Sequence, residues 1–248
     1  MKTCEKKIKE YAEKIIFFLK KYILVNKLNG FVLGLSGGVD SAVTLLLLLK
    51  TIEKNKIHVL ILPCESGKKD EEYAKQLCDK FDIKYKIIDL TPIYRTTIQN
   101  IEKSFLLSQK TKNNIKARLR MCTLYAIAQE KKSLVVGTSN LDEIYTGFFT
   151  KFGDSACDIL PLSQLTKTEI YSLAKMLGVT EEIIKRKPSS GLNKNANDEN
   201  ELGTTYKNID NFLNGKKINN KAKKRINYLH KISEHKRKPI PKPPAFKR

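Results

Sequence analysis

The sequence predicts an α/β protein with a doubly wound, mainly five-stranded parallel sheet and helices on both faces. Two observations predict this class. Short apolar runs of strand length alternate with longer segments whose apolar residues recur at helical spacing, which is typical of a parallel sheet covered on both sides. The chain has 248 residues, 41% of them hydrophobic, which is enough to bury one sizeable core. We therefore expect a single domain over residues 1–248.

The expected strands are short apolar segments at residues 31–35, 56–63, 84–89, 133–137 and 158–162. The expected helices precede, separate and follow these strands, at residues 5–25, 39–53, 70–81, 91–108, 114–131, 166–177, 205–213 and 219–233. The first of them makes residues 1–29 an N-terminal helical segment. The helix at 166–177 has a recognisable start, because Thr166 and Glu169 are spaced as a capping box.

Two segments lack this periodicity. Residues 188–203 begin with a polar, turn-rich stretch, which predicts a mobile loop, since such a length without regular structure is uncommon in a compact domain. Residues 234–248 are basic and rich in proline, which disfavours helix and predicts an extended tail.

The formal net charge of +21 has two interpretations, a lysine-rich solvated surface or a surface that binds polyanions such as nucleic acids or nucleotides. Charge alone does not separate them. The five cysteines form no C-x-x-C pair, so neither a zinc site nor a dithiol motif is expected. No apolar run approaches the roughly 20 residues of a membrane span, and no signal-peptide pattern opens the chain. We expect a cytoplasmic protein with no membrane partner.

The stretch SGGVDS at 36–41 lies where the first strand passes into a helix, and ligands of parallel sheets bind beyond such strand ends. Gly37 and Gly38 allow backbone N–H groups to approach an anion, and the helix start is electropositive. The motif lacks the Lys-Ser or Lys-Thr pair of the ordinary P-loop. Asp40 is suited to holding a magnesium ion that bridges to phosphate, because its own charge repels phosphate. The plainer alternative is a glycine-rich turn before a buried helix.

SGGVDS after an apolar strand resembles the pyrophosphate loop of the ATP pyrophosphatases. Further segments occur in the order seen in NAD synthetases: NNIKARLRM (113–121), VVGTSNLDEIYTGFFTKFGDSACDILPLSQLTKTEIYSLAKMLGV (135–179), KPSSGL (187–192), NDENELG (197–203) and SEHKRKP (233–239). The sequence is thus similar to that family from Gly30 to Pro239. The resemblance implies an adenine nucleotide alpha-hydrolase-like fold. It also implies amidation of deamido-NAD with ammonia through an adenylated dinucleotide, giving NAD, AMP and pyrophosphate.

The resemblance also implies roles for single residues. Asp40 and Glu143 match the magnesium carboxylates, although Glu143 taken alone would be a solvated charge on a helix. The residues matched to ATP contacts are Gly34, Leu35, Ser36, Gly37, Gly38, Val39, Asp40, Ser41, Thr138, Lys167 and Ser189. The residues matched to deamido-NAD contacts are Arg118, Lys151, Asp158, His235 and Lys236. Asp154 is hypothesised to accept a proton from ammonia, which would make Asp40, Glu143, Lys167 and Asp154 the catalytic set.

The sequence departs from the family pattern at Asn113, Asn193 and Ala196, where glycine, tryptophan and glutamine are frequent. The pyrophosphate loop begins at Ser36, which leaves no room before it for an amidotransferase domain, so ammonia is the expected nitrogen donor. The resemblance implies a homodimer, and no nucleic-acid partner is expected. Two alternatives remain at this point: a tRNA-modifying ATP pyrophosphatase, whose paired reactive cysteines are missing here, and a basic nucleic-acid-binding module with a decayed nucleotide site.

Overall fold

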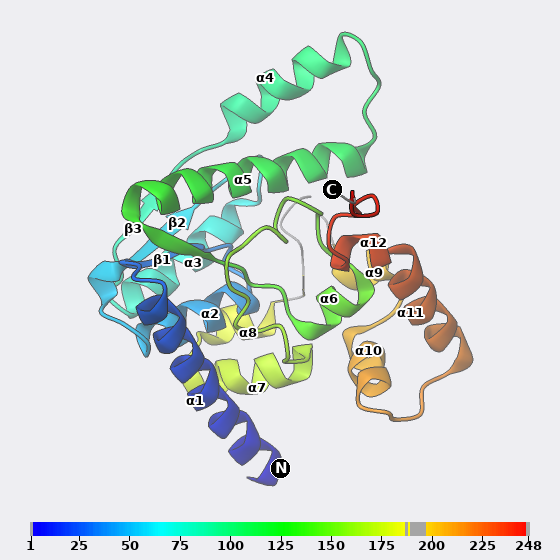
Figure 1. Ribbon diagram of the computed structural model, residues 1–248. Coiled ribbons are helices and arrows are strands. Elements are labelled where there is room, and N and C mark those ends of the chain that lie inside the picture. Colours follow the sequence, from blue (N-terminus) through cyan, green and yellow to red (C-terminus); the bar gives the residue numbers. More distant parts are fainter. Residues whose placement is uncertain (1, 187, 189–196, 247–248) are drawn as a thin grey trace.

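The computed structural model describes residues 2–186, 188 and 197–246 (Figure 1). Its described residues form an open sheet of four parallel strands: β1 (Gly30–Gly34), β2 (Ile57–Ile61), β3 (Tyr85–Ile87) and β4 (Ser133–Val136). The strand order is β3-β2-β1-β4. The chain therefore winds outward from β1 through β2 to β3 and then returns to the other side of β1. The carboxyl ends of β1 and β4 flank the point where the winding direction changes, which is where open α/β sheets bind ligands.

The predicted fifth strand at residues 158–162 is wrong. Ile159 makes only an isolated parallel bridge to Val136. Two backbone hydrogen bonds flank it, from Asp158 N to Val135 O (2.9 Å) and from Gly137 N to Ile159 O (2.9 Å). Pro161, two residues later, has no N–H to extend the ladder. The segment thus touches the edge of the sheet without becoming a strand of it.

The long predicted helices are confirmed, most of them with shorter ends. They are α1 (Lys2–Val25), α2 (Val39–Leu49), α3 (Lys68–Lys80), α4 (Thr91–Glu102), α5 (Gln109–Lys131), α7 (Lys167–Leu177), α10 (Tyr206–Leu213) and α11 (Asn220–Ile232). The structure adds one 3-10 turn and four short helices that the sequence did not predict: η1 (Lys54–Lys56), α6 (Leu141–Thr146), α8 (Glu181–Lys185), α9 (Asp198–Leu202) and α12 (Glu234–Arg237).

Two of these short helices correct the predictions for the aperiodic segments. Helix α9 occupies 198–202, so the expectation of an unstructured stretch is wrong there, while residues 189–196 lie outside the described part of the chain. Helix α12 occupies 234–237, so the extended tail begins only after it, ahead of the first of its prolines at 239. From 239 to 246 the backbone has no helix or strand, as expected.

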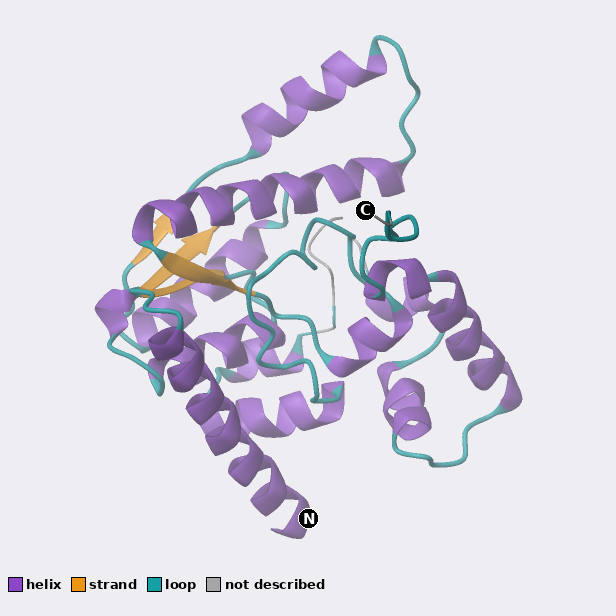
Figure 2. Cartoon of the chain, in the orientation of Figure 1, coloured by secondary structure: helices purple, strands orange, loops and turns teal. Residues whose placement is uncertain are grey.

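Helices cover both faces of the sheet, as the doubly wound class requires (Figures 1 and 2). Alternate side chains of β1 enter different cores, because successive residues of a strand point to opposite faces. Phe31 and Leu33 pack in the core that includes α1, α2 and α7, whereas Val32 packs in the core that includes α4 and α5. A third, smaller cluster joins α9, α10 and α11 beside the sheet. Within the described residues, no helix combines the length and apolarity needed to cross a membrane.

Candidate active site

A cavity of about 1090 Å³ opens at the carboxyl ends of the strands. Its walls come from the turns after β1, β2 and β4, from α5, and from the C-terminal helices. The predicted phosphate-turn residues that line it are Gly34, Leu35, Ser36, Gly38, Val39, Asp40 and Ser41. The switch point of the sheet is therefore also where the molecule is hollowed.

The turn between β1 and α2 has the shape expected of an anion cradle. Gly37 has a φ of +75°, and a Cβ atom on it would lie 2.2 Å from the carbonyl oxygen of Asp70, so no other residue fits. The hydroxyls of Ser36 and Ser41 lie 3.0 Å apart, and Ser41 Oγ also donates to Gly38 O (3.0 Å). These contacts aim two hydroxyls and the start of α2 at the cavity.

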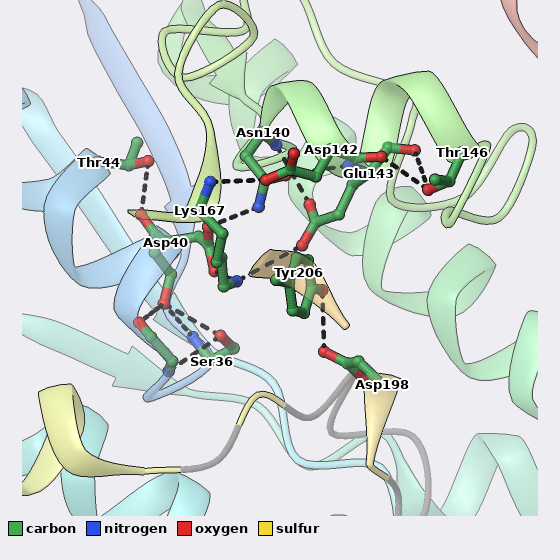
Figure 3. Close-up of polar contacts among 12 residues, drawn as sticks. Ser36, Asp40, Thr44, Asn140, Asp142, Glu143, Thr146, Lys167, Asp198 and Tyr206 are labelled. Carbon is green, nitrogen blue, oxygen red and sulfur yellow. Dashed lines mark hydrogen bonds and ion pairs between the residues drawn. The ribbon is translucent and has the colours of Figure 1, made fainter. Parts of the chain in front are cut away.

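Asp40, Glu143 and Lys167 meet beside this turn (Figure 3). Lys167 Nζ lies 2.5 Å from Asp40 Oδ2 and 3.7 Å from Glu143 Oε1. Asn140 Nδ2 donates to the other oxygen of Asp40 (2.9 Å). The three charged residues come from the first turn of α2, from the first turn of α6 and from the first turn of α7, so the starts of three helices converge on one point.

Hydrogen bonds at the starts of α6 and α7 position Glu143 and Lys167. In α6, Asn140 caps the backbone N–H of Glu143 (3.0 Å), and Glu143 Oε2 accepts from Asn140 N (3.2 Å), which leaves Oε1 to face Lys167. In α7, the predicted capping box between Thr166 and Glu169 is confirmed. The backbone N–H of Lys167 itself donates to Asp142 Oδ2 (2.6 Å). These contacts fix the Glu143 carboxylate directly and the backbone of Lys167 at the start of its helix.

The electrostatics of this trio are strongly coupled. Burial, and then the charge of Asp40, raise the pKa of the Glu143 carboxyl to about 8. Burial acts to lower the pKa of Lys167, but the charges of Asp40 and Glu143 outweigh it and raise this pKa above its ordinary value. Lys167 therefore remains a charged ammonium between two carboxyl groups.

The same two carboxylates fit a divalent cation. Both direct an oxygen at one ammonium, so their oxygens converge on one cationic position. Within the described residues no group of three or more His, Cys, Asp and Glu side chains could hold a metal. A magnesium ion here would therefore need phosphate oxygens and water for the rest of its octahedral shell, as a nucleotide-bound ion does.

Four of the predicted dinucleotide residues lie together on another wall of the cavity. Arg118 Nη2 donates to Lys151 O (3.2 Å), and Lys151 Nζ donates to His235 O (2.9 Å). Lys236 Nζ donates to Gly147 O (2.7 Å) and Phe149 O (2.6 Å). Arg118 belongs to α5, Lys151 to the loop after α6, and the other two to α12. This wall gathers three cations.

The remaining predicted residues are placed differently. Asp154 and Thr138 line the cavity. Asp154 Oδ1 accepts from Thr150 N (2.8 Å), and burial raises the pKa of the Asp154 carboxyl. Asp158 does not line the cavity: its carboxylate accepts from Val135 N (2.7 Å) and from the Tyr125 hydroxyl (3.2 Å). Ser189 lies outside the described residues.

Several polar residues at or beside the cavity were not in the predicted set of site residues. Arg120 Nη2 donates to Ser66 Oγ (2.8 Å), and Asp198 accepts from the buried Tyr206 hydroxyl (3.3 Å). Asn140 had a readable signal, since its position three residues before Glu143 forms a capping box. Arg186 had none.

A glycine turn and two convergent carboxylates at the switch point of a parallel sheet define the class: a nucleotide-binding α/β protein without the ordinary P-loop. The family model for NAD synthase matches residues 11–240. The chain belongs to that family. This assignment favours neither the tRNA-modifying enzyme nor the decayed binding module that the sequence had left open.

Named relatives agree with the family. The chain is 40% identical over 244 residues to the NH(3)-dependent NAD(+) synthetase of Alkaliphilus oremlandii. The aligned region covers 95% of this chain and 97% of the relative. It is similar to the structure of an NMN synthetase from Francisella tularensis, with a TM-score of 0.91, 40% identity and coverage of 96% and 99% of the two chains. An NH3-dependent NAD synthetase from Campylobacter jejuni gives a TM-score of 0.79 at 29% identity, with 95% and 98% covered.

Proposed function

We propose that the protein is an ammonia-dependent NAD synthetase. It would use ATP to amidate deamido-NAD with ammonia, giving NAD, AMP and pyrophosphate. The observation that carries the proposal is the convergence of Asp40, Glu143 and Lys167 beside the phosphate turn, within a cavity whose other wall gathers cations. Family membership supports the same chemistry.

In the first step a nicotinate carboxylate oxygen attacks the α-phosphorus of ATP, and the bond from that phosphorus to the bridging oxygen of pyrophosphate breaks. The turn at Gly34–Ser41, with Thr138 and Ser189, binds the nucleotide. Lys167 offsets the charge that grows on the departing pyrophosphate. A magnesium ion held by Asp40, Glu143 and phosphate oxygens would supply further charge neutralisation.

In the second step ammonia attacks the acyl carbonyl, the carbon–oxygen bond to AMP breaks, and one proton is lost from nitrogen. Arg118, Lys151, His235 and Lys236, which line the cavity, are proposed to hold the dinucleotide, whereas Asp158 lies behind this lining and would support it through Val135 and Tyr125. Asp154 is proposed to accept the proton, since burial raises the pKa of this carboxyl and makes it a better base at neutral pH. No side-chain nucleophile is required, because AMP is already a good leaving group.

We also propose, on the family resemblance, that the enzyme works as a homodimer in the cytoplasm. Neither property enters the chemistry above.

A second candidate differs only in the substrate. The Francisella tularensis structure with a TM-score of 0.91 is described as an NMN synthetase. An enzyme of that kind would amidate nicotinate mononucleotide, which has the same reacting carboxylate as deamido-NAD but lacks the adenylyl half. The adenylation and amidation steps would then be unchanged, and only the grip on the distal part of the substrate would differ.

One experiment tests both candidates. The purified protein is incubated with ATP, magnesium and ammonium, and with either deamido-NAD or nicotinate mononucleotide. AMP and the amidated product are quantified by chromatography, and kcat/KM is compared for the two substrates. A higher value for deamido-NAD supports the first proposal, and a higher value for nicotinate mononucleotide supports the second. Absence of AMP and amide with both substrates, together with tight tRNA binding, would overturn the assignment.

A further inference from the structure

Arg186 connects two separate parts of the fold beside the cavity, the start of α3 and the turn after β1. Its Nη2 lies 2.5 Å from Asp70 Oδ1, in the first turn of α3. Its Nη1 donates to the carbonyl oxygen of Gly37 (3.3 Å), in the turn after β1. The guanidinium also lies over the ring of Tyr73, 5.9 Å from its centroid. We call Arg186, Asp70 and Gly37 the clasp.

The clasp is built as a fixed element. The Arg186 and Asp70 side chains are only 20% and 18% exposed, so their ion pair is sheltered from solvent. The start of α3 also presses on the turn from the same side, since a Cβ atom on Gly37 would lie 2.2 Å from Asp70 O. The planar fork of arginine can serve a carboxylate and a carbonyl at once, which the single ammonium of lysine does less well.

The geometry gives the clasp a consequence for nucleotide binding. The C=O of Gly37 and the N–H of Gly38 belong to one planar trans peptide, so they point in opposite directions. Holding the carbonyl at Arg186 therefore fixes the direction of the Gly38 N–H, which is directed at Ser36 Oγ (3.3 Å). Ser36 and Gly38 both line the cavity. Gly38 is also the N-cap of α2, with no side-chain cap of its own.

We propose that Arg186 is a positioning residue for the nucleotide, acting through Asp70 and the Gly37 carbonyl to orient the first N–H groups of the phosphate turn. The proposal rests on the proposed function, in which that turn receives ATP. Arg186 also lines the cavity, so the competing role is direct contact with a phosphate oxygen. The two roles differ in what Asp70 does: a positioning arginine needs it, whereas a phosphate-binding arginine does not.

The test measures the binding of magnesium α,β-methylene-ATP, which cannot be cleaved between the α and β phosphates, by titration calorimetry. Arg186→Gln, Asp70→Asn and the double variant are compared with the unaltered protein. Each single change is expected to weaken binding on the order of tenfold, and the double variant to bind no more weakly than either single one, because both break the same element. Arg186→Lys is measured beside them and is expected to restore less than half of the lost affinity, on a logarithmic scale.

Lys185 and Glu181 supply the matched control. They form an ion pair of 2.6 Å on the exposed face of the neighbouring helix α8, so Lys185→Gln and Glu181→Gln are expected to bind the analogue normally. Normal binding by Asp70→Asn, or full rescue by Arg186→Lys, would overturn the proposal in favour of direct contact. Failure of the unaltered protein to bind the analogue would overturn it as well. No amide is formed in this binding measurement. Failure of the amidation assay alone would therefore contradict the proposed function but not the positioning role of Arg186.

Discussion

The two walls of the cavity balance their charges in different ways. On the wall that contains the turn after β1 and the starts of α2, α6 and α7, the cations pair with carboxylates: Lys167 with Asp40 and Glu143, and Arg186 with Asp70. On the wall formed by α5, the loop after α6 and α12, the cations instead donate to backbone carbonyls, and in the described part of the chain none of Arg118, Lys151 and Lys236 forms an ion pair.

From this difference we expect the two walls to bind different substrates. A wall of paired charges suits a nucleotide that carries its own divalent cation, because the carboxylates then hold the metal while the lysine faces phosphate. A wall of unpaired cations keeps a net positive charge for an anionic substrate that brings no metal. Substitutions, salt and pH should therefore affect the two walls differently.

Asp40→Asn changes the wall on which the cations are paired with carboxylates. It removes one of the two converging carboxylates, so kcat is expected to fall by about 10³-fold, since loss of one well-placed electrostatic group at a reacting centre has effects of this size. Pyrophosphate release under saturating substrates measures it. Glu53→Gln, which removes a carboxylate from an exposed ion pair with Lys56, is the control and should retain full activity. An Asp40→Asn enzyme within tenfold of normal would contradict the shared metal position.

Lys236→Gln removes a cation from the wall on which the cations donate to backbone carbonyls. Here the KM of the nicotinate substrate is expected to rise on the order of tenfold, with the KM of ATP unchanged, because the lost charge lies on the wall proposed to bind the nicotinate substrate. Initial rates at varied concentrations of each substrate separate the two constants. Lys238→Gln, two residues further along and in an exposed pair with Glu234 (3.0 Å), is the matched control. Equal changes in both KM values would show that the walls do not divide the substrates.

Ionic strength should affect the KM values of the two substrates differently. Raising salt from about 50 to about 200 mM is expected to increase the KM of the nicotinate substrate by about threefold, and that of ATP by less, since mobile ions screen exposed charges more than buried pairs. The measurement is a pair of substrate titrations at each salt concentration, with chloride and acetate salts compared to separate screening from specific ion binding. A steeper salt dependence for ATP would contradict the division.

On both walls most of the residues predicted from the sequence lie at the cavity, but several contacts that position them were not predicted. Short apolar strands and long amphipathic helices follow from periodicity, and the turn at 36–41 follows from its glycines. The convergence of Asp40 with Glu143 and Lys167 was expected from the family resemblance, and the structure places the three side chains together. Their roles stay proposals. Asn140 could have been found from its capping spacing.

Other features depend on contacts that no local pattern records. Arg186 donates to the carbonyl oxygen of Gly37, which lies 149 residues earlier in the chain, so the sequence around either residue does not predict the contact. Helices as short as α9 and α12 form no stable structure alone and depend on tertiary packing, which explains why they were missed. The fifth strand was predicted from its apolar residues, but Pro161 and a single bridge to Val136 limit it.

The smallest expected effect is a pH dependence of the unpaired wall. Burial, and then the neighbouring charge of Lys110, lower the pKa of Lys236 below its ordinary value. Below its pKa the ammonium is charged, so the lowered value means that the charge is lost earlier as pH rises than for an exposed lysine. The KM of the nicotinate substrate should therefore increase by a few-fold on the alkaline side, while the KM of ATP does not follow it. Lys236→Arg keeps its charge through this range and should flatten the profile. If the KM of the nicotinate substrate rises equally at alkaline pH in Lys236→Arg, the titrating group is not Lys236, and the pH dependence does not come from the wall of unpaired cations.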